Sequence, residues 1–340
     1  MDIVVVGAGS WGTALASVLC HHGHRVTLWG RDAALLADIE RTGENRRYLP
    51  GLRLPPGLRT NPSLADALRS LPRQGPGQAM IVAVVPSQTL RHVMSQVATE
   101  VPQEAIVVSA AKGIENETLL TMEQVLRQVL PPAPVERLAV LSGPSFARET
   151  VEGQPTAVVV ASRSPEVAQT VQQAFQMTTF RVYTSTDVIG VEIGGAVKNV
   201  IAIACGMAEG LGLGHNARAA LITRGLAEMS RLGVRLSANP LTLAGLAGLG
   251  DLVLTCTGGA SRNRSVGLQL GQGRALGEVM AGMTQVAEGV RTTRSLRDLA
   301  VRLGVEMPIS QAMYQVLYED RPVRQVLVDL LGRPPRAELG

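Results

Sequence analysis

The chain contains few lysines and few cysteines for its 340 residues. Its cations are 30 arginines and only two lysines, Lys112 and Lys198. Arginine stays charged, whereas a buried lysine can release its proton, so the two lysines are candidates for chemistry unless codon bias alone explains the ratio. The three cysteines, Cys20, Cys205 and Cys256, have neither the even number nor the spacing of a disulfide framework or a zinc site. We therefore expect no metal ion and a reducing, cytoplasmic location.

Long apolar runs and clustered basic residues are also absent. No stretch of about 18 uninterrupted apolar residues occurs, so we expect no membrane span. The apolar segment 2–20 lacks the basic start of a secretory signal and is interrupted by three glycines. The sequence pI is 9.3, but the arginines are dispersed, and aromatic residues suited to stacking on bases make up only 3% of the chain. We therefore expect no nucleic-acid partner.

The first half of the chain alternates short apolar runs with helical segments. Continuous Val, Ile and Leu without alternation is typical of strands buried on both faces. Such runs occur at residues 3–6, 26–29, 79–85, 105–109, 138–141, 157–161 and 181–184. Loops rich in proline and glycine are expected at 49–62, 72–77 and 131–134. This pattern predicts an α/β domain with a doubly wound parallel sheet over residues 1–187.

After residue 187 the apolar residues recur at helical spacing, for example through 188–211, 217–232 and 292–303. This predicts an all-helical domain over residues 188–332 and a frayed tail over 333–340. Basic and acidic residues both number 16 up to residue 187, whereas 16 basic and 12 acidic residues follow it. The whole net charge of +4 therefore lies in the second domain, which favours an anionic ligand there.

A glycine-rich turn, Gly-Ala-Gly-Ser-Trp-Gly at residues 7–12, joins the first apolar run to a helical segment. Here Gly7 allows a tight turn, Gly9 lets a pyrophosphate approach the backbone, and Gly12 lets the helix pack on the strand. The N–H groups at the start of the helix would face the phosphates. A lone motif of this kind is weak, but strand, turn and helix in this order predict a Rossmann-type dinucleotide-binding domain.

The end of the second apolar run indicates which cofactor is bound. Arg31 and Asp32 follow this run directly. An acid here binds the ribose 2′-hydroxyl of NAD, whereas an arginine pairs with the 2′-phosphate of NADP. Because Arg31 is nearer the strand end, NADP is favoured, with NAD also usable, unless Arg31 is only a solvated loop cation.

Both lysines occupy places where an amine could act. Lys112 follows the run 105–109, which places it in the crevice outside the carboxyl end of a parallel strand, unless it is an ordinary surface lysine. Lys198 and Asn199 are the only strongly polar residues in a helical segment that otherwise consists of small and apolar side chains. Burial there would lower the pKa of Lys198 and suit it to proton exchange with a carbonyl oxygen, although a structurally paired lysine is the alternative. Asp251, alone among apolar neighbours, is either its partner or a helix cap.

A turn in the second domain offers donors for a phosphate. Ser261, Arg262, Asn263 and Arg264 follow Thr-Gly-Gly at 257–259, where a helix is expected to begin. A hydroxyl, guanidinium groups and an amide at a helix N-terminus suit phosphate binding. A solvated basic turn is the alternative.

Several of these segments form one ordered series of motifs. The series comprises residues 7–14, 84–88, 111–114, 141–147, 195–199, 248–252, 261–263 and 286–289. In this series the chain resembles bacterial NAD(P)-dependent glycerol-3-phosphate dehydrogenases over nearly its whole length. The resemblance implies reduction of dihydroxyacetone phosphate to sn-glycerol 3-phosphate, the backbone of phospholipids.

The resemblance also implies roles for individual residues. Lys198 corresponds to the proton donor, with Asp251 as its partner and a substrate contact. Substrate contacts are implied for Lys112, Gly143, Ser145, Ser261, Arg262 and Asn263. Cofactor contacts are implied for Ser10, Trp11, Arg31, Lys112, Ala147, Arg262, Val286 and Glu288, besides the glycines of the turn.

Two other functions remain open at this point. A β-hydroxyacid or ketopantoate-type reductase shares the arrangement of domains and a helix-borne lysine, but its substrate carries a carboxylate in place of a phosphate. A non-catalytic NAD(P)-sensing module would share the fold without the reaction. The partners expected are a small phosphorylated substrate and a second copy of the chain, since a helical second domain is compatible with a homodimer.

Overall fold

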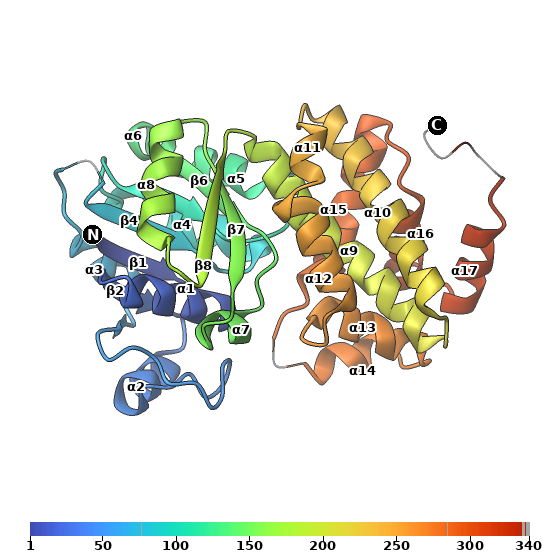
Figure 1. Cartoon of the computed structure of the whole chain (residues 1–340), viewed down its shortest axis with the longest axis horizontal. Coiled ribbons are helices and arrows are strands. Elements are labelled where there is room, and N and C mark those ends of the chain that lie inside the picture. Colours follow the sequence, from blue (N-terminus) through green and yellow to red (C-terminus); the bar gives the residue numbers. More distant parts are fainter. Residues whose placement is uncertain (76, 284, 335–336, 338–340) are drawn as a thin grey trace.

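The computed structural model describes residues 1–75, 77–283, 285–334 and 337. A sheet flanked by helices forms one part of the molecule, and a bundle of helices forms the other (Figure 1). The long helix α9, Val188–Gly210, begins directly after the sheet and runs through the bundle. In the predicted frayed tail, residues 335, 336 and 338–340 lie outside the described part of the chain.

One sheet contains eight strands in the order β3-β2-β1-β4-β5-β6-β7-β8. The strands are β1 Asp2–Val6, β2 Arg25–Trp29, β3 Arg59–Asn61, β4 Ala79–Ala83, β5 Ile106–Ser109, β6 Leu138–Ser142, β7 Thr156–Ala161 and β8 Phe180–Ser185. This confirms the Rossmann-type sheet and all seven predicted runs. Only β6 and β7 pair antiparallel, because the connection between them carries a single short helix and no crossover back over the sheet.

Both faces of the sheet are covered, as the uninterrupted apolar runs predicted. Ile3 and Val5 pack towards α1 Ser10–His21 and α8 Pro165–Phe175. The alternate residues Val4 and Val6 pack towards helices of the opposite layer. That layer includes α3 Leu64–Arg69, α4 Leu90–Ser95 and α5 Met122–Val129. The remaining helices of this part are α2 Ala33–Thr42, η1 Ser87–Thr89, η2 Ala98–Glu100, α6 Pro132–Val135 and α7 Ala147–Val151.

The expected loop 49–62 is partly wrong, because its end forms the strand β3. Arg59, Thr60 and Asn61 pair with β2 at the edge of the sheet. An edge strand is only half covered and needs no apolar run, so polar residues at this place gave no strand signal.

The second part is helical, as predicted. Its helices are α9, α10 His215–Arg235, α11 Pro240–Leu243, a π-helical turn η3 Leu246–Gly250, α12 Asp251–Thr257, α13 Arg262–Gly271, α14 Leu276–Ala281, α15 Glu288–Leu303, α16 Pro308–Tyr318 and α17 Val323–Leu331. α9 lies at the centre and packs against α10, α12, α13 and α15. We propose to divide the two domains at Asp187, which caps the N-terminus of α9.

Glycines explain how α13 approaches α9 so closely. A Cβ on Gly206 of α9 would lie 2.0 Å from the carbonyl oxygen of Arg264. On the facing helix, a Cβ on Gly267 would lie 2.0 Å from the carbonyl oxygen of Ile203. The glycines therefore let two backbones meet, which offsets their cost of about 1 kcal/mol each within a helix.

We expect Gly267→Ala to destabilise the protein by about 2 kcal/mol, because the added methyl group must push the two helices apart. Thermal unfolding followed by circular dichroism measures the change. Gly277→Ala on α14 is the matched control, since a Cβ there meets no atom within 4 Å. An equal effect of both substitutions would contradict the close-packing argument.

Within the described residues, two stretches meet the length and mean apolarity of a membrane span, although neither is an uninterrupted apolar run. They are Val188–Gly210 and Pro240–Thr257, with mean hydropathies of 1.7 and 1.4. The first is α9, and 94% of its most apolar window is buried, so its apolarity is that of a core helix. The second is divided among α11, η3 and α12.

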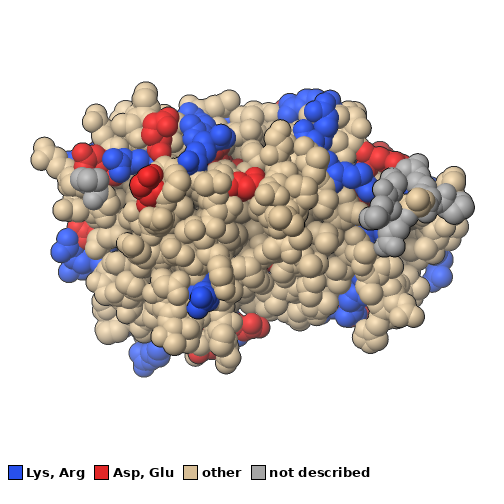
Figure 2. All heavy atoms as spheres, turned by 45° about the horizontal axis from the view of Figure 1, so that its top comes forward, with Lys and Arg blue, Asp and Glu red and all other residues tan. Residues whose placement is uncertain are grey.

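On the face seen in Figure 2, basic side chains lie in separate groups and form no continuous patch.

Candidate active site

Two lysines and one aspartate meet where the sheet faces the helical domain. Lys112 lies three residues beyond the end of β5, and Gly143 directly follows β6. Lys198 comes from the middle of α9, and Asp251 is the first residue of α12. The carboxyl ends of parallel strands are where α/β sheets bind ligands, so the predicted crevice position of Lys112 is confirmed.

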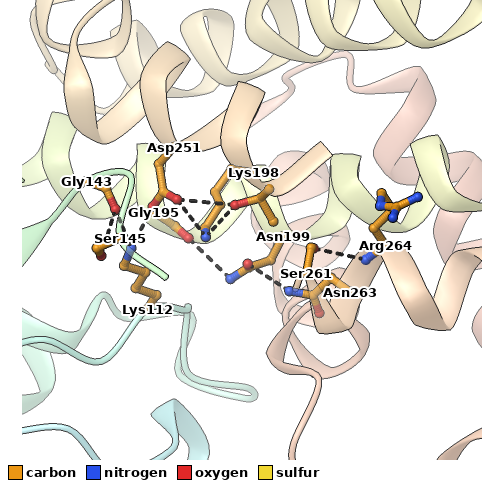
Figure 3. Close-up of polar contacts among 11 residues, drawn as sticks. Lys112, Gly143, Ser145, Gly195, Lys198, Asn199, Asp251, Ser261, Asn263 and Arg264 are labelled. Carbon is orange, nitrogen blue, oxygen red and sulfur yellow. Dashed lines mark hydrogen bonds and ion pairs between the residues drawn. The ribbon is translucent and has the colours of Figure 1, made fainter. Parts of the chain in front are cut away.

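Asp251 binds both lysines at once (Figure 3). Its Oδ2 accepts a hydrogen bond from Lys112 Nζ at 2.5 Å, and its Oδ1 accepts one from Lys198 Nζ at 3.0 Å. Thr255 Oγ1 also accepts from Lys198 Nζ at 2.9 Å. Asp251 is 2% exposed and Lys198 8%, so the three charges interact with little screening by water.

This cluster carries one more positive than negative charge, and its geometry shifts the pKa values of Lys198 and Asp251. Burial lowers the pKa of Lys198 to about 8, although the charge of Asp251 opposes this and that of Lys112 adds to it. Burial alone would raise the pKa of Asp251, but the two ammonium groups hold it below its usual range. At neutral pH Lys198 is therefore a protonated amine that gives up its proton readily.

A π-helical turn places Asp251. In η3 the N–H of Gly250 donates to the carbonyl oxygen of Gly245 at 3.0 Å. A Cβ on Gly248 would lie 1.9 Å from the carbonyl oxygen of Leu243, so only glycine fits there. Single π-turns occur frequently at functional sites, because the extra residue turns the next side chain in a new direction. Asp251 begins the helix as a paired carboxylate, and Gly250 occupies the cap position.

Asn199, which follows Lys198 on α9, links this helix to the turn at 261–263 by hydrogen bonds (Figure 3). Asn199 donates to the carbonyl oxygen of Gly195 and accepts from Asn263 Nδ2 at 2.8 Å. Asn263 Oδ1 accepts from the N–H of Gly289 at 2.9 Å. These bonds fix where α15 begins relative to α9, so Asn263 has a structural role.

Ser261 and Arg262 have separate partners. Ser261 Oγ accepts from the N–H of Arg264 and caps α13. Arg262 Nη1 donates to the carbonyl oxygen of Val286 at 2.9 Å, and the Arg262 side chain remains exposed. Ser145 Oγ and Lys112 Nζ both donate to the carbonyl oxygen of Gly143, each at 3.2 Å.

The glycine-rich turn has the shape that a dinucleotide requires. Gly7 has φ +130°, and a Cβ on it would lie 2.9 Å from the Val84 backbone. A Cβ on Gly12 would lie 1.8 Å from the carbonyl oxygen of Gly7, which shows how closely helix and strand approach. No atom lies within 4 Å of such a Cβ on Gly9, so the space beside it is open. No side chain caps α1, which leaves its first N–H groups for an anion.

Other predicted cofactor residues join the two domains. Ser10 Oγ donates to Gln285 Oε1 at 2.8 Å. Glu288, at the start of α15, accepts from Ser87 Oγ at 2.7 Å and from the N–H of Ser87. The buried Trp11 Nε1 has no hydrogen-bond partner among the described residues. Ser10 and Ser87 therefore link the N-terminal domain to the segment 285–288.

Arg31 and Ala147 are not joined to the cluster by any hydrogen bond within the described ranges. Arg31 is exposed beyond β2. The neighbouring Asp32 is occupied, because it caps α2 by accepting from the N–H of Leu35 and pairs with Arg47 at 3.1 Å. Ala147 is the first residue of α7.

Sequence reasoning missed some residues of the site. Thr255 lies four residues after Asp251 on one helix, and this spacing could have revealed it. Ser87 and Gln285 contact distant segments, and no local pattern predicts such pairs. Asn199 stood out as polar but received no role.

Comparisons with known proteins agree with this geometry. The family model described as NAD-dependent glycerol-3-phosphate dehydrogenase N-terminus matches residues 2–168, and the one described as its C-terminus matches residues 187–328. A relative from Geobacter sp. (strain M21), named glycerol-3-phosphate dehydrogenase (NAD(P)+), is 54% identical over 336 residues, which are 99% of this chain and 98% of the relative.

Solved structures show the same similarity. The crystal structure of glycerol-3-phosphate dehydrogenase from Coxiella burnetii has a TM-score of 0.91 and 38% identity, covering 98% of this chain and 99% of that one. The yeast enzyme from Saccharomyces cerevisiae has a TM-score of 0.81 and 28% identity, covering 98% and 99%. The chain therefore belongs to the NAD-dependent glycerol-3-phosphate dehydrogenase family.

Proposed function

We propose that this chain reduces dihydroxyacetone phosphate to sn-glycerol 3-phosphate, with NADPH or NADH as the hydride source. The observation that carries the proposal is the pairing of buried Asp251 with two ammonium groups, that of buried Lys198 and that of half-buried Lys112, beside a turn shaped for a dinucleotide. Family membership favours this substrate over the 2-oxo acids of a ketopantoate-type reductase. A non-catalytic sensor would have no use for a buried lysine with a lowered pKa.

The residues of the N-terminal domain suit the cofactor. The open space beside Gly9 and the uncapped start of α1 would hold its pyrophosphate, with Ser10 and Trp11 beside it. We assign Ala147, Val286 and Glu288 to further cofactor contacts by family resemblance. When bound, the nicotinamide cofactor supplies the hydride.

The lysine cluster provides the proton and stabilises negative charge. Lys198 Nζ holds a proton that it can transfer to the substrate carbonyl oxygen, and Asp251 and Thr255 orient this amine. Lys112 and the N–H groups after β6 add positive potential where the oxyanion develops. Gly143 and Ser145 line the same region.

The phosphate of the substrate suits the start of α13. Arg262 is exposed there, and backbone N–H groups at a helix N-terminus attract an anion. Ser261 and Asn263 hold this turn in place through the cap and the amide bonds.

The proposed function is tested by following NADPH oxidation with dihydroxyacetone phosphate and with dihydroxyacetone, which lacks the phosphate. We expect kcat/KM to be at least about a hundredfold higher for dihydroxyacetone phosphate than for dihydroxyacetone. Dihydroxyacetone has no phosphate and cannot form the charge-assisted hydrogen bonds to it. Chromatography should identify glycerol 3-phosphate as the product. Equal use of both ketones would contradict the assigned phosphate site.

The pH dependence follows from the lowered pKa of Lys198, about 8. Ketone reduction needs the protonated amine, so kcat should fall as pH rises through about 8. Alcohol oxidation needs the neutral amine, so its kcat should rise over the same range. Steady-state rates in both directions check this, and profiles with the same sign would contradict the proton-donor role.

Arg31 is proposed to bind the 2′-phosphate of NADP. We expect Arg31→Ala to weaken NADPH about tenfold and NADH much less, because only NADPH carries the phosphate. Fluorescence titration with each reduced cofactor measures both affinities. Arg59→Ala, on the edge strand β3, is an arginine control, and equal weakening of both cofactors by Arg31→Ala would refute the assignment.

A homodimer and a cytoplasmic location belong to the same proposal. Apolar side chains remain exposed on the helical domain, including Leu241 at 79% and Val234 at 53%. All three cysteines are free thiols, as expected in a reducing compartment. Light scattering of the purified protein tests the dimer, and cell fractionation tests the location.

A further inference from the structure

A small cavity lies behind Lys112, between the sheet and α9. Its volume is about 10 Å³, and its polar lining residues are Ser109 of β5, Ser142 of β6 and Glu192 of α9. Lys112 and Gly195 also line it. The cavity therefore shares Lys112 with the lysine cluster.

Three buried polar atoms of these residues have no partner. Ser109 Oγ, Ser142 Oγ and Glu192 Oε2 make no hydrogen bond within the described residues. The residues are 1%, 5% and 8% exposed. A buried polar atom without a hydrogen-bond partner destabilises the fold. A buried water needs about 10–15 Å³ and typically makes about three hydrogen bonds, which matches this cavity.

Glu192 also connects the two domains. Its Oε1 accepts from the N–H of Glu123 at 2.8 Å, at the start of α5. Glu123 itself is neutralised by ion pairs with Arg127 and Arg163. The other oxygen of Glu192, Oε2, has no hydrogen-bond partner among the described residues, and both Glu192 and Lys112 line the cavity.

We propose that this cavity binds one water molecule hydrogen-bonded to Ser109, Ser142 and Glu192, and that Glu192 acts through it as a positioning residue for Lys112. The inference rests on the proposed function, because Lys112 there binds an anionic substrate. In the neutral form the Glu192 carboxyl donates to the water, and the positive charge of Lys112 stays available to the substrate.

The ionised form of Glu192 would weaken substrate binding, because its negative charge offsets that of Lys112. Burial raises the pKa of Glu192 to about 7, although the Thr121 side chain and the N–H groups of Glu123 and Met122 oppose this. The other charged groups around it are Lys112, the Glu123–Arg127–Arg163 group and, across Gly195, the Lys198–Asp251 pair. The KM for the substrate should therefore increase between about pH 6 and 8, because Glu192 ionises over this range.

The test compares wild type with Glu192→Gln, which keeps an acceptor for the Glu123 N–H and a donor for the water. We expect the KM for dihydroxyacetone phosphate to rise about fivefold more in wild type than in the variant between about pH 6 and 8. Titration of the substrate and of Lys198 is common to both enzymes and cancels in this ratio. Parallel KM curves would overturn the positioning role.

Glu228→Gln is the matched control. Glu228 is also a buried carboxylate that accepts from helix N–H groups, those of Ile309 and Ser310, but it lies on α10 away from the cluster. Its KM curve should follow that of wild type. If the protein does not reduce dihydroxyacetone phosphate at all, the proposed function is wrong. If it is active but wild type and Glu192→Gln have parallel KM curves, only the role of Glu192 is wrong.

Two further measurements keep the inference testable if Glu192→Gln does not fold. Ser142→Ala removes one partner of the water and should raise the KM for dihydroxyacetone phosphate about threefold with kcat nearly unchanged. A high-resolution crystal structure should show one ordered water bonded to Ser109, Ser142 and Glu192. An empty cavity, or a Ser142→Ala variant with wild-type KM, would overturn the proposal.

Discussion

Replacing Lys198 by alanine should lower kcat for ketone reduction by about a thousandfold or more, while the affinity for NADPH changes little. Lys198 lies on the apolar helix α9, and its ammonium group donates to Asp251. General acid catalysis by a positioned group contributes a factor of about 10²–10⁴ to the rate. The cofactor residues lie on other elements, so binding of NADPH should persist. Stopped-flow turnover and fluorescence titration measure the two quantities.

Lys198→Arg separates charge from proton donation. Arginine keeps the positive charge beside Asp251 but does not release its proton at neutral pH. We expect this variant to be nearly as inactive as Lys198→Ala, with a KM closer to that of wild type. A kcat near the wild-type value in either variant would refute Lys198 as the proton donor.

Replacing Asp251 by asparagine should lower kcat/KM by about a hundredfold at neutral pH and shift the profile of ketone reduction to lower pH. The charge of Asp251 raises the pKa of Lys198 and so opposes the effect of burial. Without it the pKa of Lys198 falls further, and less of the amine is protonated at a given pH. The two ammonium groups would also lose their shared counter-charge, which should destabilise the fold by about 3 kcal/mol.

Two measurements separate these effects in Asp251→Asn. The pH profile of kcat reports the pKa of Lys198, and thermal unfolding reports stability. Asp329→Asn, which loses an exposed ion pair with Arg321 beside a hydrogen bond from Gln325, is the control for a lost carboxylate. An unshifted profile in Asp251→Asn would show that Asp251 does not hold the proton on Lys198.

Local patterns in the sequence predicted the architecture and the reacting groups. The apolar runs predicted the sheet because strands buried on both faces admit few polar residues. The scarcity of lysine drew attention to Lys112 and Lys198, and a lone aspartate in an apolar segment predicted the pairing of Asp251 with Lys198. The glycines of α9 permit the close approach of the α13 backbone.

Other features depend on contacts between distant segments, and no local pattern predicts them. Lys112 and Lys198 share one carboxylate only because the ends of β5 and α12 meet. Ser261 and Asn263 were interpreted as phosphate donors, but their side chains also cap α13 and bond Gly289. The proposed role of Glu192 depends on the serines that end β5 and β6, and no local pattern predicts it.

The central claim is that this site reduces a phosphorylated ketone. The most direct test measures the rate of NADPH and NADH oxidation with dihydroxyacetone phosphate and, separately, with ketopantoate and other 2-oxo acids. We predict turnover of dihydroxyacetone phosphate with both cofactors, faster with NADPH at low concentration, and little or none of the 2-oxo acids. Preferred reduction of a 2-oxo acid would contradict the account.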